Sequence, residues 1–113
     1  MHELSIAKNI VGIAEEEVRK ANAKSVKAIE LDIGKLAGID LHALDFVWEL
    51  AVKKTVLQHA AKIIHVRPGI GYCDHCEREF EVDQLFDQCP VCGWYSDLKG
   101  GTELRIKSLT LTT

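Results

Sequence analysis

Two Cys-x-x-Cys pairs constrain this chain more than any other feature of its 113 residues. The first pair is Cys73 and Cys76, the second is Cys89 and Cys92, and twelve residues separate the two pairs. Each short turn supplies two thiols, and the intervening loop brings the pairs together, as a tetrahedral zinc ion requires. The spacing therefore predicts a zinc site with four cysteine ligands.

Disulfides and iron are the alternatives for the four thiols. Acidic residues among the first twenty exclude a secretory signal peptide, so we expect a location in the reducing cytosol. Disulfides are rare in that compartment. Iron is compatible with the same thiolates, since the CPVCG run is similar to a rubredoxin knuckle. The CDHCE run lacks the glycine of the other rubredoxin knuckle, so zinc is the favoured metal.

The cysteines lie in a segment, residues 69–101, that is poor in aliphatic side chains. The stretch between the pairs has four large apolar residues, too few for an independent core: Phe80, Val82, Leu85 and Phe86. Metal binding would supply the missing folding energy. We therefore predict a zinc-ribbon-like module over residues 69–101, and a second domain from residues 1–68 plus 102–113.

The remaining residues have the patterning of an α+β domain. Apolar residues three and four apart predict an amphipathic helix over 3–22, and a second helix follows Asp40 and extends to about Val56. Alternation predicts three strands: 25–34, 62–67 and 103–112. We expect two helices packed on a three-stranded sheet, with the four-cysteine module inserted before the last strand. The two strands that flank the module would then be neighbours.

Charge and composition exclude several classes of function. The net charge of −3 argues against a general nucleic-acid binder. Residues 69–99 have seven acids and two bases, so this module would repel phosphate and could instead meet a basic protein partner. No apolar run approaches the roughly twenty residues of a membrane span. The sequence contains no catalytic or nucleotide-binding motif. A metal ion bound by four cysteines has no open coordination position for a substrate, so we do not expect an enzyme.

The amino terminus, Met1-His2-Glu3, offers a set of nitrogen ligands. The amine of Met1, the amide and imidazole of His2 and the amide of Glu3 could close chelate rings around one ion. Nickel(II) and copper(II) tolerate such square-planar nitrogen sets. On the residues alone, an exposed terminal histidine without a metal role is the simpler interpretation.

Four segments change this assessment, because together they resemble the HypA/HybF family of hydrogenase nickel-insertion accessory proteins. They are MHELSIA, IGKLAGID, the CxxC…CPxCG pair and ELRIKSL, and they cover essentially the whole chain in the family's order. The resemblance implies a metallochaperone that accepts nickel at its N-terminus, with His2 as ligand and Glu3 in the same site. The amine of Met1 would complete the nitrogen set described above. It also implies structural zinc on the four cysteines: Cys73, Cys76, Cys89 and Cys92.

The resemblance further implies partners and a compartment. Family members work with a nickel GTPase, HypB, and deliver nickel to the large-subunit precursor of nickel-iron hydrogenase, and some also serve urease. We expect a cytoplasmic protein, a monomer or weak homodimer, without nucleic-acid or membrane partners. The alternative function is a zinc-ribbon adaptor that only docks to proteins. Three histidines are expected at the surface without a ligand role: His42, His59 and His65. His75 lies inside a cysteine pair and could compete for zinc.

Overall fold

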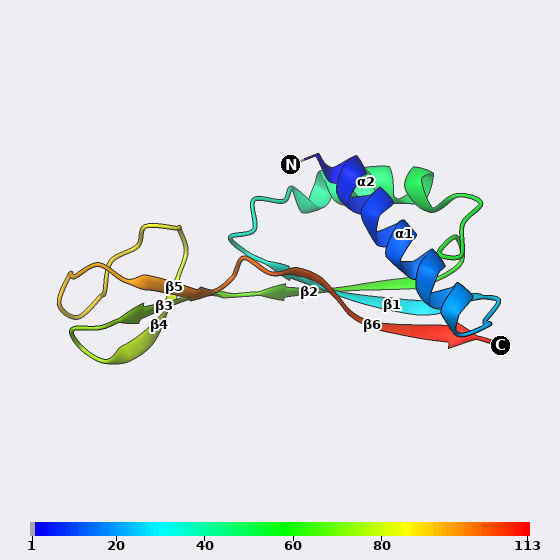
Figure 1. Ribbon diagram of the computed structural model, residues 1–113. Helices are drawn as coiled ribbons and strands as arrows, with labels where there is room; N and C mark the ends of the chain where they lie inside the picture. The colour runs from blue at the N-terminus through cyan, green and yellow to red at the C-terminus, as the bar shows by residue number, and fades with distance from the viewer. Residues whose placement is uncertain (1) are drawn as a thin grey trace. The chain divides into compact units, whose positions relative to one another are not determined.

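The computed structural model describes residues 2–113, which form two helices and six strands (Figure 1). The helices are α1 (Glu3–Lys20) and α2 (Leu41–Val52). The strands are β1 (Ser25–Gly34), β2 (Ala61–Arg67), β3 (Gly69–Cys73), β4 (Arg78–Val82), β5 (Asp97–Gly100) and β6 (Leu104–Thr112). None of the helices in this described part of the chain is long and apolar enough to cross a membrane.

Helix α1 packs through one apolar stripe. Its buried side chains recur at the spacing of a helical face: Ile6, Ala7, Ile10, Ala14 and Val18. The predicted helix is confirmed, but Leu4 and Ile13 are exposed because they lie at the two edges of the stripe. Helices α1 and α2 pack against each other, and Figure 1 shows both on the same face of the sheet that contains β1.

Helix α2 begins where predicted and ends earlier. The Asp40 carboxylate accepts the N–H groups of the second and third helical residues at 3.0 and 3.1 Å, as an N-cap does. The helix ends at Val52 and does not reach Val56. Lys54 adopts a φ of 64°, and the Thr55 hydroxyl donates to the Val52 carbonyl at 2.6 Å. A residue in this left-handed region ends a helix, and a lysine gives little sequence signal of it.

The first sheet has the strand order β2-β1-β6. The three predicted strands are confirmed, but the expectation that β2 and β6 are neighbours is wrong, because β1 lies between them. Burial agrees with this order: Ile29, Leu31 and Ile33 of β1 are at most 1% exposed, whereas β2 and β6 contain only half-buried and exposed residues. The most buried strand occupies the centre, where neighbours cover both of its edges.

A second sheet lies within the cysteine-rich segment and has the order β4-β3-β5. Strand β3 pairs antiparallel with β4 and with β5, and an irregularity in the β3–β5 register falls between Ile70 and Gly71. The predicted fold class is confirmed: two helices and a three-stranded sheet, with a four-cysteine module before the last strand.

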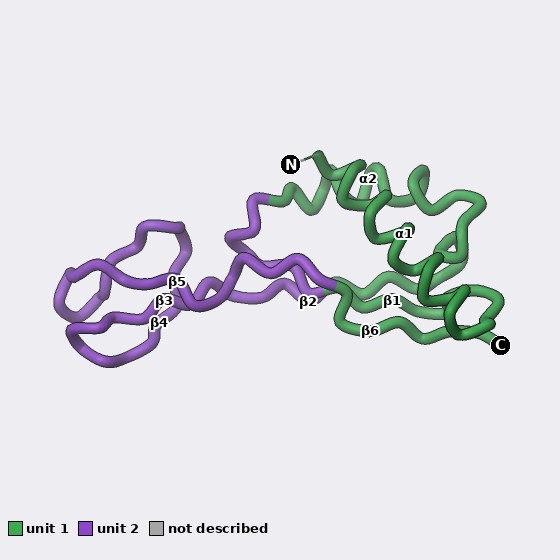
Figure 2. Tube along the Cα trace, viewed as in Figure 1, with its two compact units in different colours: residues 1–31, 39–64, 106–113 green, residues 32–38, 65–105 purple. Residues whose placement is uncertain are grey.

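The chain divides into two compact units, drawn in different colours in Figure 2. Unit 1 consists of Met1–Leu31, Ile39–Ile64 and Ile106–Thr113, and unit 2 consists of Asp32–Gly38 and His65–Arg105. Unit 1 contains both helices and most of the buried apolar side chains, whereas unit 2 contains the second sheet and the four cysteines. Three of the four boundaries between the units fall within strands β1, β2 and β6, and the fourth falls in the loop between β1 and α2.

Three glycines allow backbone segments of unit 2 to approach closely. A Cβ on Gly34 would lie 2.0 Å from the Gly101 carbonyl oxygen. Gly101 itself has a φ of 107°, and a Cβ there would lie 2.5 Å from the Gly69 Cα. The Leu36 N–H also donates to the Gly101 carbonyl at 2.7 Å. Only glycine fits positions where backbone meets backbone at these distances.

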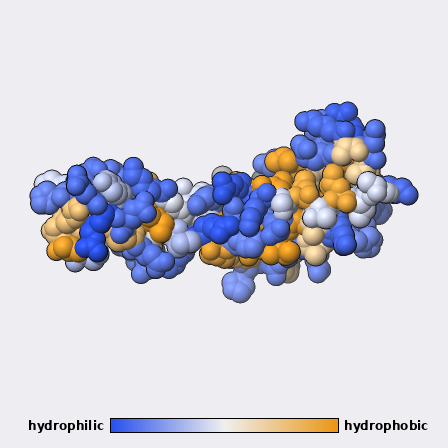
Figure 3. All heavy atoms as spheres, turned by 90° about the horizontal axis from the view of Figure 1, so that it is seen from below, coloured by the Kyte–Doolittle hydropathy of each residue, from blue (hydrophilic) through white to orange (hydrophobic). Residues whose placement is uncertain are grey.

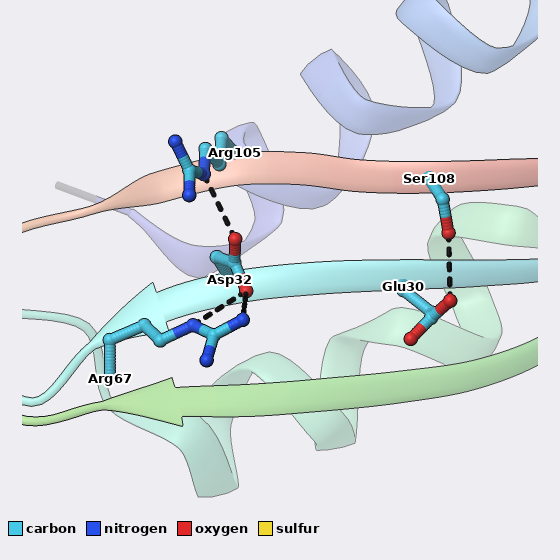
Figure 4. A network of polar contacts seen from close by, with 5 residues as sticks. All are labelled: Glu30, Asp32, Arg67, Arg105 and Ser108. Carbon is cyan, nitrogen blue, oxygen red and sulfur yellow. Dashed lines mark hydrogen bonds and ion pairs between the residues drawn. The ribbon is translucent and has the colours of Figure 1, made fainter.

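A buried carboxylate links three segments of unit 2 (Figure 4). Asp32 in β1 is fully buried, and it accepts hydrogen bonds from Arg67 Nε at 2.8 Å and from Arg105 Nε at 2.9 Å. Burial opposes ionisation of this carboxyl, but the hydrogen bonds from Arg105 and Arg67 outweigh it and hold the Asp32 pKa below its ordinary value. Asp32 alternates along β1 with the buried Leu31 and Ile33, so its position in the strand gives no sign that it is buried as well.

Candidate metal centre

The structure brings the four cysteine sulfurs into one cluster. The Sγ atoms of Cys73, Cys76, Cys89 and Cys92 all lie within 4.8 Å of one another. The Cys73–Cys92 pair is 3.6 Å apart and the Cys76–Cys89 pair is 4.0 Å apart. A tetrahedral zinc ion with Zn–S bonds of about 2.3 Å separates its sulfurs by about 3.8 Å. The cluster therefore has the size that a four-coordinate zinc ion requires.

Local backbone geometry positions each pair of thiols. Strand β3 ends at Cys73, and the chain turns so that the Cys76 N–H donates to the Cys73 sulfur at 3.3 Å. In the second pair, the Trp94 N–H donates to the Cys92 sulfur at 3.4 Å. Backbone N–H donors stabilise the thiolate form of a cysteine, which is the form that binds metal.

The residue after each pair has a left-handed backbone conformation. Gly93 has a φ of 73°, as expected for the glycine that follows the second pair, and its N–H donates to the Cys89 carbonyl at 2.9 Å. Glu77 occupies the same place after the first pair with a φ of 52°. The two turns are therefore alike, although the sequence marks only one of them with glycine.

The electrostatics of the cluster favour a bound cation. The neighbouring Cys92 thiol and burial raise the pKa of Cys76 to about 12, whereas the Cys92 backbone N–H lowers the pKa of Cys89 to about 6. The thiols therefore do not ionise together, because adjacent thiolates repel one another. A divalent cation would compensate four thiolates, and zinc coordinates cysteine in that form.

One side of the cluster is open. Cys73 and Cys89 are buried, but Cys92 is exposed. The ring of His75, inside the first pair, stacks on the Trp94 ring with centroids 5.8 Å apart and an interplanar angle of 29°. His75 is not among the clustered ligand atoms, so within the described residues the candidate centre has sulfur ligands alone.

The N-terminal site residues are separate in sequence from this cluster. Exposed His2 is the N-cap of α1 with extended backbone angles, φ −82° and ψ 129°, and Met1 lies outside the described residues. The Glu3 carboxylate accepts the Asp40 N–H at 3.3 Å, a contact that the sequence did not predict. Among residues 2–113, no cluster of three or more ligand side chains includes a histidine.

A four-thiol centre on a small α+β fold defines a metal-binding protein. Residues 1–111 match the model of the family described as "Hydrogenase/urease nickel incorporation, metallochaperone, hypA". The chain belongs to this HypA family. The family consists of metallochaperones, so the expectation of a carrier and not an enzyme is confirmed.

Relatives of known name support the family assignment over the whole length. The hydrogenase maturation factor HypA of Parabacteroides distasonis is 41% identical over 112 residues, which cover 98% of this chain and 97% of that protein. The hydrogenase maturation factor HypA of Azoarcus sp. strain BH72 is 40% identical over 112 residues, with 98% of each chain covered.

Solved structures support the fold. The solution structure of the nickel metallochaperone HypA from Helicobacter pylori matches with a TM-score of 0.71 and 23% identity, covering 99% of this chain and 98% of that one. A second HypA solution structure matches with a TM-score of 0.73 and 23% identity, covering 98% of this chain and 96% of the other. At this identity the similarity establishes the shared architecture.

Proposed function

We propose that this protein binds nickel(II) at its N-terminus through Met1, His2 and Glu3 and delivers the ion during maturation of nickel-iron hydrogenase. The observation that carries the proposal is the position of the first helical hydrogen bond. The Ile6 N–H donates to the His2 carbonyl at 3.1 Å, which is the first bond of helix α1. The amides of His2 and Glu3 therefore make no intrahelical hydrogen bond.

Free amides matter because nickel(II) binds deprotonated backbone nitrogens in square-planar sets. In the helix interior, deprotonation of an amide would break an i to i−4 hydrogen bond. At the start of α1 that cost is absent. The His2 side chain is exposed, so its imidazole can turn toward the same ion without disturbing the buried stripe of the helix, which begins at Ile6.

The Glu3 carboxylate has an orienting role in this proposal. It accepts the Asp40 N–H at 3.3 Å and so links the first turn of α1 to the start of α2. We propose that Glu3 contributes its backbone amide to nickel and uses its carboxylate to fix the chain next to His2. A Glu3→Gln variant should then bind nickel only modestly less well, since an amide oxygen still accepts a hydrogen bond.

For the cysteine cluster we propose zinc as the resident metal, held by Cys73, Cys76, Cys89 and Cys92. A zinc ion bound by four thiolates has no open position, so it supplies folding energy and not catalysis. The sulfur separations of 3.6 and 4.0 Å support this choice.

The proposed setting is the cytoplasm. HypB and the hydrogenase large-subunit precursor are the proposed partners, and urease is a further recipient through its own maturation. We expect neither nucleic acid nor membrane as partner, and a monomer or weak homodimer in solution. An adaptor that uses only its zinc module for docking is the alternative, and nickel binding distinguishes the two functions.

Nickel titration by calorimetry tests the proposal on four zinc-loaded proteins: untagged wild type, His2→Ala, wild type with an N-terminal extension, and His59→Ala. His59 is the matched control because it is also an exposed histidine of unit 1. We expect tight binding by wild type and His59→Ala only, because the extension removes the free amine. Amide deprotonation releases protons, so the affinity should fall as the pH falls.

Equal affinity in all four proteins would refute the N-terminal site and place nickel elsewhere. Zinc content and amide spectra, measured on the same samples, should be the same in all of them. A loss of zinc in His2→Ala would mean that the substitution acts through the fold.

A further inference from the structure

A group of exposed apolar side chains lies in unit 2 next to the cysteine turns. Five large hydrophobic residues between positions 85 and 95 are more than half exposed: Leu85, Phe86, Val91, Trp94 and Tyr95. Phe86 is 93% exposed and Tyr95 is 76% exposed. Exposed aromatic residues are typical of surfaces at which proteins bind other proteins. Neither the metal centre nor the N-terminal site uses Phe86 or Tyr95.

Part of this group lines a shallow hollow of about 280 Å³. We name it the Phe86–Tyr95 surface, and its residues are Leu85, Phe86, Asp87, Gln88, Tyr95 and Ser96. Its volume is at the lower limit of small-molecule pockets, which are about 300 to 1,000 Å³. The hollow therefore suits one apolar side chain of a partner better than a cofactor.

Hydrogen bonds hold the two walls of the hollow in place. The Asp87 carboxylate accepts the N–H groups of Asp83 and Gln84 at 2.8 and 3.1 Å, which fixes the turn that presents Phe86. The Ser96 hydroxyl donates to the Asp87 carbonyl at 2.7 Å, which ties the opposite wall to this turn. A preformed surface loses less conformational entropy when a partner binds.

The segment that contains the hollow has a net negative charge. Residues 69–101 contain seven acids and two bases, a net charge of −5. Lys35, which lies outside this segment, pairs with Asp83 at 2.7 Å and offsets one of these charges, whereas Asp87 belongs to the hollow itself. Figure 3 shows hydrophobic and strongly hydrophilic side chains adjacent to each other on this module. The zinc site would add to the negative charge, because four thiolates exceed the charge of one zinc ion by two.

We propose that the Phe86–Tyr95 surface docks a lysine- or arginine-rich segment of a partner protein that inserts one apolar side chain into the hollow. The partner's apolar side chain would pack between Phe86 and Tyr95 and provide affinity. The basic residues would provide orientation and a fast association rate through the acidic surroundings. The proposal goes beyond nickel binding and does not depend on it, because none of its residues belongs to the N-terminal site.

Binding of defined peptides to the zinc-loaded full chain tests this proposal. The probe is a short fluorescein-labelled peptide rich in lysine with a central leucine. A second peptide has serine in place of the leucine, and a third has glutamate in place of the lysines. Anisotropy gives the affinity, and amide chemical shifts of the labelled protein locate the site. We expect only the first peptide to bind well, with shifts concentrated in residues 83–97 and an affinity that falls as salt is added.

Phe86→Ala should weaken this binding at least about tenfold, as loss of a central aromatic contact does. Phe46→Ala is the matched control, because Phe46 is 87% exposed but lies on α2 in unit 1, and it should bind as wild type does. Both variants should retain wild-type zinc content, since neither side chain is buried. His2→Ala should bind the peptide unchanged, which separates this result from the nickel proposal.

Several results would overturn the proposal. They are equal binding of the leucine and serine peptides, shifts centred outside residues 83–97, or equal effects of Phe86→Ala and Phe46→Ala. Shifts in residues 83–97 that grow with protein concentration in the absence of peptide would assign the surface to self-association instead. The same shifts on addition of phosphatidylcholine vesicles would assign it to lipid.

Discussion

The cysteine cluster allows metal ligation and side-chain packing to be separated by experiment. Cys73 is fully buried and Cys92 is exposed, yet both sulfurs belong to the same cluster, 3.6 Å apart. If packing holds the module together, Cys73→Ser should be damaging and Cys92→Ser nearly harmless. If a metal ion holds it together, both variants should lose the metal and the folded module. We predict the second outcome.

The magnitudes support this prediction. Within residues 69–101, the buried apolar side chains are Val82 and the two ligand candidates Cys73 and Cys89. Burying a valine contributes about 2 kcal/mol, whereas a structural zinc site contributes about 10 to 16 kcal/mol of folding free energy. The metal term therefore exceeds the packing term several-fold, and loss of either ligand should unfold the module. Unit 1 should remain folded, because it contains most of the buried apolar residues.

The assay is amide hydrogen exchange of the full chain together with zinc analysis of the same samples. In Cys73→Ser and Cys92→Ser, protection should disappear in β3, β4 and β5 and persist in β1 and both helices. Val91→Ala is the control, because Val91 lies in the same turn as Cys92 but is not a ligand candidate. Protection of β3–β5 that survives in Cys92→Ser but not in Cys73→Ser would refute metal ligation as the cause.

Three further predictions concern the framework of the fold. The ion pairs of Asp32 stabilise the protein fully at pH values above the ordinary carboxyl pKa of about 3.9. This stabilisation is lost as the pH falls through the lowered pKa of Asp32 in the folded state. Urea unfolding should therefore find Asp32→Asn less stable than wild type at neutral pH, with a gap that narrows below about pH 4; a constant gap would contradict this. Asp40→Ala should lower the free energy of unfolding by about 1 kcal/mol through loss of the α2 N-cap, and Asp40→Ser should restore most of it in the same measurement. Gly101→Ala should lower the thermal midpoint more than Gly38→Ala, because both have positive φ but only the first Cβ meets backbone, 2.5 Å from Gly69; equal midpoints would contradict the close approach.

The sequence by itself determined the features that depend on local spacing. The two cysteine turns follow from two pairs of thiols three residues apart, and Gly93 adopts the left-handed conformation expected of it. The N-cap of α2 at Asp40 and the three strands of the first sheet follow from patterns a few residues long. Such signals are readable because the interactions behind them join residues close in the chain.

Tertiary structure alone decided the features that join distant residues. Asp32 has the strand position of a solvent-facing acid, yet it is buried because Arg67 and Arg105 reach it from two other strands. Nothing in the alternating pattern of β1 indicates those partners, because they lie 35 and 73 residues away.

The same reason applies to the strand order and to the Phe86–Tyr95 surface. Strand β1 is central and has the most completely buried apolar residues of the three strands, and this order appears only once the strands are packed together. The hollow beside Phe86 is lined by residues 85–88 and 95–96, and the Ser96 hydroxyl joins these two segments by a hydrogen bond to the Asp87 carbonyl nine residues away. Local patterns determined which residues form each element, and long-range contacts determined which of those residues meet.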